Sequence, residues 1–331
     1  MAITSADANG LTGSLSVKLA TNGIFAPWPL RTKVFLLVLA IILCFGTGLQ
    51  YWNHKKLYEN ELRLVNDKHL VIASNLSLTL SRYARDVSLV FLHQALNSAA
   101  PMTAETAIGE DTDMMAAMDL DGFTVLSPEN EILSEFSLTG IELAIPDAAV
   151  LDELRLGTNE RLHGVQMSDL QRIGDSRYFI LGYNLPGGRL AIGYLNTRYV
   201  KTVQNRISFG ELGHSAIFDS AGTTVAHPVK KAEENMMDAS GIPIVKRMLN
   251  QETGVDQFYS PPLNADMIAG FSFVPETGWA VMVPQPLSEL VNSVSTSLRQ
   301  TELFIVGVSL RLACLGWILT HLLVRPIPSF T

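Results

Sequence analysis

The chain has 331 residues, of which 17% are charged, and its formal net charge is −8. This length buries a sizeable core without disulfides, and two cysteines exclude a disulfide scaffold. So low a charged fraction indicates that a few segments concentrate the apolar residues.

The first apolar segment is residues 34–52, a run without a charged residue that follows a tail at residues 1–33. About 20 apolar residues cross a hydrocarbon core about 30 Å thick, so we expect a transmembrane helix. Tyr51 and Trp52 at its end are typical of the membrane interface. A cleaved signal peptide is the alternative, although no clean cleavage site of small residues follows.

The second apolar segment is residues 303–324, which a short tail at residues 325–331 follows. It is also long enough to span a membrane. Arg311 near its centre costs about 2.5 to 3.5 kcal/mol on insertion, which the surrounding large apolar residues offset. Two interpretations of Arg311 stay open, namely snorkelling to the polar interface and a polar contact across a helix dimer.

Basic residues flank both spans on the same side, because Arg31 and Lys33 precede the first and Arg325 follows the second. They predict that both termini are cytoplasmic and that the loop between the spans lies in the periplasm of a bacterial inner membrane. Residues 53–300 hold 19 Lys and Arg against 30 Asp and Glu, a net charge of −11. Such an acidic region excludes nucleic acid as its partner.

Residues 53–98 are expected to form one long helix. No Gly or Pro occurs from Lys55 to Asn97, and apolar residues recur every three or four positions. A helix of this length with one apolar stripe needs a partner surface, either the domain it carries or the same helix of a second chain. We expect both, and therefore a homodimer through this helix and the transmembrane helices.

After Pro101, short strands and turns replace the helical periodicity. Residues 99–198 predict an α+β unit built on antiparallel hairpins, and residues 199–300 predict a second unit of the same kind. The expected fold class is therefore α+β, with a long N-terminal helix bracing two tandem antiparallel-sheet units between two transmembrane helices.

The second unit carries recognisable motifs. GELGHSAIFDSAGTTVAHP at residues 210–228 is followed by TGVDQFYS at 253–260 and MIAGFSFVPETGWAVMVPQP at 267–286. This order and spacing resembles the membrane-proximal half of double Cache sensor domains, which lie outside the membrane in bacterial chemoreceptors, histidine kinases and diguanylate cyclases. The resemblance covers residues 55–300, in outline for the first half, and implies that both units are PAS-like.

The motif residues that match the family are Asp219, Gly222, Thr277, Gly278 and Trp279. Their chemistry indicates structural roles. Gly222 supplies a turn with positive φ, Asp219 accepts hydrogen bonds within that turn, and Trp279 is a large apolar body for the core.

The resemblance also implies that ligand binds in the membrane-distal unit, where strand alternation draws attention to Tyr183, Tyr194 and Asn196. A polar end on an apolar face is typical of a pocket. Asn196 lies about where amino-acid-binding members of the family place an aspartate that holds the ligand amine. An amide carries no negative charge, so the sequence does not favour an amino acid.

Arginines offer the alternative ligand chemistry. Arg161, Arg172 and Arg177 lie in the same unit, and a guanidinium binds a carboxylate in bidentate fashion. These residues predict a carboxylate ligand, with solvated surface arginines as the competing interpretation.

Catalytic motifs are missing from the sequence, including a nucleophile elbow, a zinc-protease helix and a phosphate-binding loop. We expect no enzyme activity and no cofactor. His214 and His227 hint at a metal, but no third ligand follows at a suitable spacing.

The sequence therefore predicts an extracytoplasmic small-molecule sensing domain of a transmembrane signalling receptor. Arg-Pro-Ile at residues 325–327 resembles the start of a HAMP linker, but no output domain follows in this sequence. We expect either a truncated receptor or one that signals through a cytoplasmic partner. The alternative is a membrane-tethered binding protein that presents ligand to a partner kinase or transporter.

Overall fold

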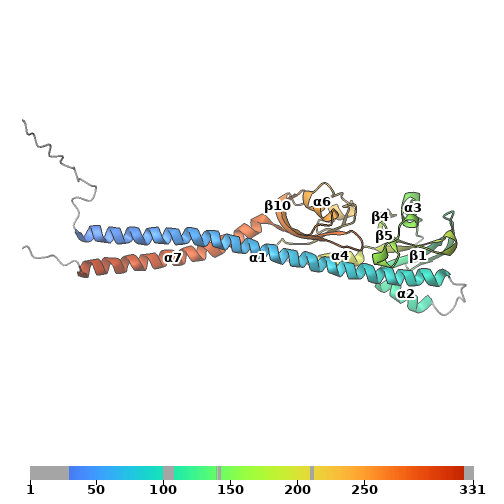
Figure 1. Ribbon diagram of the computed structural model, residues 1–331, viewed down its shortest axis with the longest axis horizontal. Coiled ribbons are helices and arrows are strands. Elements are labelled where there is room, and N and C mark those ends of the chain that lie inside the picture. Colours follow the sequence, from blue (N-terminus) through green and yellow to red (C-terminus); the bar gives the residue numbers. More distant parts are fainter. Residues whose placement is uncertain (1–29, 100–107, 139, 141–142, 209–211, 324–331) are drawn as a thin grey trace, which may run out of the picture. The chain divides into compact units, whose positions relative to one another are not determined.

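The structure, a computed structural model, describes residues 30–99, 108–138, 140, 143–208 and 212–323 (Figure 1). It divides into two compact units, of which the larger is Leu57–Ser297 and the smaller is Met1–Lys56 with Leu298–Thr331. The predicted tails at residues 1–33 and 325–331 lie outside the described residues, apart from residues 30–33.

The smaller unit contains the first part of helix α1 (Leu30–Ala99) and the last part of helix α7 (Leu287–Leu323). Both helices are long and apolar enough to cross a membrane. Within this unit the Phe35 and Trp317 rings meet edge to face, with centroids 5.0 Å apart. Arg311 on α7 is exposed.

The first part of the larger unit along the chain, called the distal part below, is a six-stranded antiparallel sheet of order β2-β1-β6-β5-β3, in which β4 also pairs with β5. The strands are β1 (Leu120–Leu126), β2 (Ile132–Ser137), β3 (Gln166–Met167), β4 (Gln171–Ile173), β5 (Ser176–Asn184) and β6 (Leu190–Asn196). The helices are α2 (Ile108–Ala117), α3 (Ala148–Leu156), the 3₁₀ turns η1 (Glu160–Leu162) and η2 (Pro186–Gly188), and α4 (Arg198–Arg206), which leads out of the sheet.

The second part along the chain, called the proximal part below, is a five-stranded antiparallel sheet of order β8-β7-β11-β10-β9. Its strands are β7 (Ala216–Phe218), β8 (Thr224–Ala226), β9 (Gly254–Ser260), β10 (Ala265–Phe273) and β11 (Ala280–Pro286). The helices here are α5 (Lys230–Glu234) and α6 (Pro243–Leu249), and α7 follows β11 directly. The predicted fold class, one long helix with two antiparallel sheets, is confirmed.

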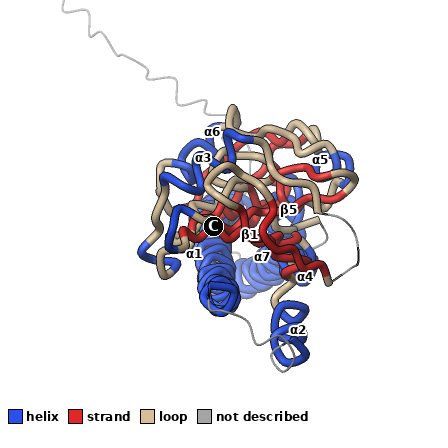
Figure 2. Tube along the Cα trace, turned by 90° about the vertical axis from the view of Figure 1, so that its right-hand side faces the viewer, coloured by secondary structure: helices blue, strands red, loops and turns tan. Residues whose placement is uncertain are grey.

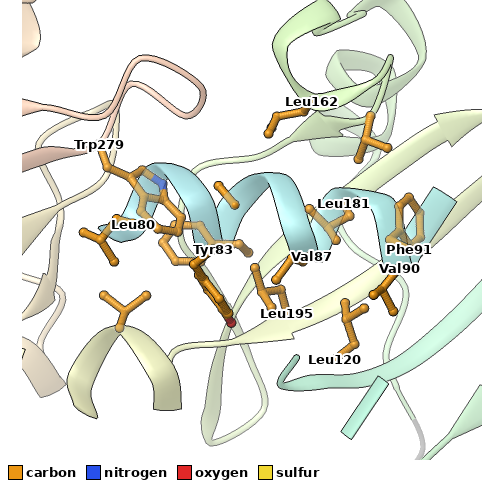
Figure 3. Packing of buried hydrophobic residues seen from close by; sticks show 14 of the residues in the cluster. Leu80, Tyr83, Val87, Val90, Phe91, Leu120, Leu162, Leu181, Leu195 and Trp279 are labelled. Carbon is orange, nitrogen blue, oxygen red and sulfur yellow. The ribbon is translucent and has the colours of Figure 1, made fainter. Parts of the chain in front are cut away.

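Helix α1 packs on both sheets because its buried positions recur at helical spacing. Leu76, Leu80, Val87 and Phe91 are almost fully buried and belong to one cluster with residues of both sheets (Figure 3). The predicted bracing role of this helix follows from the buried stripe that these residues form.

Two glycines let α1 approach the sheets closely. A Cβ atom at Gly193 would lie 2.7 Å from the Phe91 ring, and one at Gly270 would lie 2.3 Å from the carbonyl carbon and oxygen of His69. The second contact is with backbone, which has no alternative rotamer. A side chain at Gly270 would therefore force the helix and sheet apart.

The opposite faces of the sheets are covered by separate elements, with α3 over the distal sheet and α6 over the proximal one (Figures 1 and 2). Leu151 and Leu154 of α3 are buried, as are Val245 and Met248 of α6. Each sheet thus has one face on α1 and one face under its own helix.

Replacing Gly270 by alanine tests the close approach of α1. We expect Gly270→Ala to lower the free energy of unfolding by about 1–3 kcal/mol, because the added methyl group overpacks a backbone contact. Denaturant unfolding of the full chain in detergent measures the loss. Gly241→Ala is the matched control, since nothing lies within 4 Å of a Cβ there. Equal stability of the two variants would contradict this packing.

Candidate ligand-binding site

Tyr194 and Asn196 lie on the face of the distal sheet that α3 covers. The register places Ile180 opposite Tyr194 and Tyr178 opposite Asn196, so all four side chains share that face. The Tyr178 and Tyr194 rings meet edge to face with centroids 6.0 Å apart. The structure therefore brings these two predicted residues together with a second tyrosine.

Tyr183 lies on the other face of the sheet, away from Tyr194. Its partner across the ladder is Ala191, and it packs with the cluster formed around α1. The reason is the alternation of side chains along β5, which sends odd-numbered residues toward α1 and even-numbered residues toward α3.

The three predicted arginines contact the proximal part instead of the α3 face. Arg161 Nη1 donates to the Pro275 carbonyl oxygen at 2.7 Å, and Arg172 Nη2 donates to the Glu234 carbonyl oxygen at 2.5 Å.

Arg177 Nη2 forms a salt bridge of 2.8 Å with Glu233 Oε1, and both side chains are largely buried. The arginines lie on η1 and the β4–β5 hairpin, which adjoin the proximal part, so their guanidinium groups are held away from Tyr194. A carboxylate bound by these guanidinium groups would therefore lie away from Tyr194 and Asn196.

The charged residue that the sequence interpretation missed is Asp121. It is only 5% exposed, and its Oδ1 accepts hydrogen bonds of 2.7 Å from Asn196 Nδ2 and from Arg198 Nη2. The β1–β6 register shifts between Leu120 and Gly122, and this irregularity hides Asp121 from a simple alternation pattern. No other signal in the sequence singles it out.

Asn196 also organises the start of α4. Its Oδ1 accepts from the Arg198 backbone N–H at 2.9 Å, while its Nδ2 donates to Asp121. Arg198 is half exposed and makes a second ion pair with Asp119 at 2.9 Å. The end of β6 therefore carries a small polar cluster, in which Asp119 and Asp121 provide two carboxylates and Arg198 provides one guanidinium.

Burial shapes the chemistry of the two tyrosines. It raises the pKa of Tyr194 to about 12, and the charge of Glu135 adds to the rise. Burial also raises the pKa of Tyr178, to which the charge of Asp121 contributes. Both phenols are neutral at neutral pH and present hydroxyl groups that can donate.

Leu143 fills the space above this cluster in the described part of the chain. It is 4% exposed and packs with α3, Ile192 and Tyr194. A Cβ atom at Gly122 would lie 1.9 Å from Leu143 Cδ1, so the glycine provides the room for this side chain. A ligand on this face would displace Leu143.

The motif residues of the proximal part lie at its boundary with the distal part. Asp219 is fully buried, and its Oδ1 accepts from the Thr223 N–H at 2.7 Å while its Oδ2 accepts from the Leu170 N–H of the distal part at 3.1 Å. Gly222 has φ of 92°.

The Thr-Gly-Trp turn lies at the same boundary. Gly278 has φ of 75°. Thr277 Oγ1 accepts from the Trp279 N–H at 3.2 Å. The Trp279 ring lies 4.6 Å from the Phe179 ring of the distal sheet.

Comparison with known proteins agrees with the motifs. Residues 188–300 match the Cache 3/Cache 2 fusion domain, and no curated protein matches the chain. The fold is similar to that of the extracellular domain of rpHK1S-Z16, named as a histidine kinase, with 10% identity and a TM-score of 0.53 over 70% of this chain and 98% of that chain.

Two Campylobacter jejuni chemoreceptor domains are also similar. The periplasmic sensory domain of Tlp1 has 10% identity and a TM-score of 0.50 over 70% of this chain and 98% of that chain. The sensory domain of Tlp3, solved with isoleucine bound, has 8% identity and a TM-score of 0.49 over 72% of this chain and 98% of that chain. Residues 188–300 are therefore similar to the Cache 3/Cache 2 fusion domain, and the region between the two candidate spans has the fold of the extracellular domain of rpHK1S-Z16.

Proposed function

We propose that this chain is the extracytoplasmic sensing region of a transmembrane signalling receptor, and that it binds a small molecule on the α3 side of the distal sheet. The observation that carries the proposal is the buried polar cluster of Asp121, Tyr178 and Asn196 at the end of an otherwise apolar face. A few convergent polar groups on an apolar surface are typical of small-molecule sites. The position of this fold between two candidate spans supports the receptor role.

Asp121 changes the ligand chemistry that the residues favour. Asn196 alone offers no negative charge, but the carboxylate that it touches does. The hydrogen bonds from Asn196 and Arg198 both end on Oδ1 of Asp121, and a carboxylate has further acceptor positions. We therefore propose that the ligand carries a cationic amine that binds beside Asp121, within reach of the Tyr178 hydroxyl.

Replacing Asp121 tests the amine. We expect amine-bearing small molecules to raise the melting temperature of the full chain in nanodiscs, and Asp121→Asn to weaken their binding roughly 10- to 100-fold, the equivalent of a charged hydrogen bond worth about 1.5–3 kcal/mol. Calorimetric titration measures the affinity. Asp152→Asn on the exposed surface of α3 removes the same charge and serves as the control.

The ligand panel contains amines without a carboxylate, organic acids without an amine, and amino acids. If only the organic acids bind, and Asp121→Asn does not change their affinity, the proposal of a cationic-amine ligand is contradicted and a carboxylate ligand is favoured. Failure of every class to bind wild type and Leu143→Ala alike would contradict a site on this face, because the alanine variant removes the side chain that fills it.

We also propose that the receptor is a homodimer through α1. Leu64, Val71, Leu78, Leu89 and Leu96 are all more than 45% exposed on the helix surface away from the sheets. Their spacing is seven residues, with one interval of eleven, which keeps them on one narrow stripe. A heptad stripe of this kind fits the same stripe of a second copy.

Cysteine cross-linking tests the dimer. In a chain with Cys44 and Cys314 replaced by alanine, we expect Val71→Cys and Leu78→Cys each to form a disulfide-linked dimer in membranes, because equivalent positions face each other in a parallel pair. Non-reducing electrophoresis measures the product. Leu156→Cys, 87% exposed at the end of α3, is the control. Equal cross-linking of all three variants would contradict a specific α1 interface.

The proposed orientation places both termini in the cytoplasm and leaves α7 to carry the signal to a cytoplasmic partner. Arg31 and Lys33 before the first span support it. A membrane-impermeant maleimide should label Leu156→Cys in cells with a permeabilised outer membrane. Labelling that appears only after lysis would reverse the orientation.

A further inference from the structure

Two histidines meet inside the proximal part, at the end of the β7–β8 hairpin. The His214 and His227 rings have centroids 5.6 Å apart and an interplanar angle of 69°. They are 9% and 5% exposed, so solvent hydrates neither ring well. No sensing or structural role described above uses either imidazole.

Backbone hydrogen bonds fix the tautomer of each ring. His214 Nδ1 lies 3.0 Å from the Leu212 carbonyl oxygen, which can only accept, so Nδ1 carries the proton. Its Nε2 is then a lone pair, and this atom is buried with no hydrogen-bond partner among the described residues. His227 Nδ1 accepts from the Val229 N–H at 3.0 Å, so its proton is on Nε2.

This arrangement does not suit a metal. Two imidazole ligands must each offer a lone pair, but His227 uses its own for the Val229 amide. No group of three or more possible metal ligands occurs in the described ranges. His214 Nε2 is a buried acceptor beside a second neutral ring, and it can instead bind one proton.

The charged groups near His227 lie at the boundary between the two sheets. Glu233 Oε2 accepts from the His227 backbone N–H at 3.5 Å. Glu233 Oε1 binds Arg177 of the distal sheet at 2.8 Å and Lys201 of α4 at 2.7 Å. A positive charge on the histidine pair would compete with these two cations for the same carboxylate.

Groups near His214 belong to the start of α7. The His214 N–H donates to the Pro284 carbonyl oxygen of β11 at 3.1 Å. The Leu212 N–H, in the residue whose carbonyl binds the His214 ring, donates to Glu289 Oε2 of α7 at 3.3 Å. The ring is therefore two hydrogen-bonded steps from the helix that leads to the second span.

We propose that the His214–His227 pair is a proton-binding site, at which a proton from solvent forms an N–H bond at His214 Nε2 and leaves a buried cation beside the start of α7. The O–H bond of a hydronium ion breaks as the N–H bond forms, water is released, and the site gains one positive charge. Relief of that charge requires the His214 ring to move toward water or toward Glu289, which loosens the first turn of α7. This role is independent of the ligand site on the distal sheet.

The protonation equilibrium has a definite sign. Burial lowers the pKa of His214, and burial with the neighbouring ring lowers the pKa of His227 to about 4. Since the unfolded histidines have a pKa of about 6.5, the unfolded chain binds more protons below that value. The histidine pair therefore does not reduce the free energy of unfolding above about pH 6.5. As the pH falls toward the lowered pKa values of the two rings, protonation of the unfolded chain reduces that free energy.

Hydrogen–deuterium exchange of the full chain in nanodiscs at pH 7.5 and pH 5 tests the proposal. After correction for the intrinsic exchange rate, we expect acid to raise exchange several-fold at residues 212–218 and 287–291 of wild type. His214→Asn keeps a donor for the Leu212 carbonyl but cannot take the proton, and it should abolish the rise. His93→Asn, at an exposed histidine of α1, is the control and should behave as wild type.

An equal rise in His214→Asn, His93→Asn and wild type would overturn the proposal. A second measurement covers an unstable His214→Asn variant. Wild type with ¹³C-labelled histidine should show the His214 ring titrating below the unfolded value of about 6.5 together with the change at α7. Titration of every ring at or above that value would also overturn it.

Discussion

Trp279 of the proximal sheet packs against Phe179 of the distal sheet, and this contact makes the two sheets one body. Both rings are almost fully buried, and they belong to one hydrophobic cluster that runs along α1 from Leu76 to Ala95. Truncating a buried tryptophan costs about 3–5 kcal/mol, a large fraction of the stability of a typical domain. The close approach of α1 at Gly193 brings Phe91 into the same cluster.

Polar contacts surround that apolar joint and give it a fixed geometry. Asp219 binds the Leu170 amide across the boundary, and Arg177 binds Glu233 on α5. Arg177 directly precedes Tyr178 of the candidate site on β5, so a ligand that shifts this strand would also pull on α5. The proton site proposed at His214 and His227 adjoins the same carboxylate. Ligand binding on the distal sheet and proton binding at the histidine pair thus both act on the contacts between the two sheets, and α7 transmits the resulting change.

The sequence was sufficient for the fold because its signals are local. Apolar runs, a helix without Gly or Pro, and the turns around Gly222 and Gly278 each depend on neighbouring residues. The site needed three-dimensional information. Strand alternation does not tell which face α3 covers, so it cannot separate Tyr183 from Tyr194. It also does not tell which hairpin end adjoins the second sheet, and this position pairs Arg177 with Glu233. Asp121 was missed because an irregular register at Leu120–Gly122 breaks the pattern.

Differential scanning calorimetry of the full chain tests most directly whether the two sheets are one cooperative body. The shared core predicts a single heat-absorption peak for residues 57–297, with equal calorimetric and van't Hoff enthalpies. Two separate peaks, with Trp279→Ala changing only the proximal one, would contradict the account.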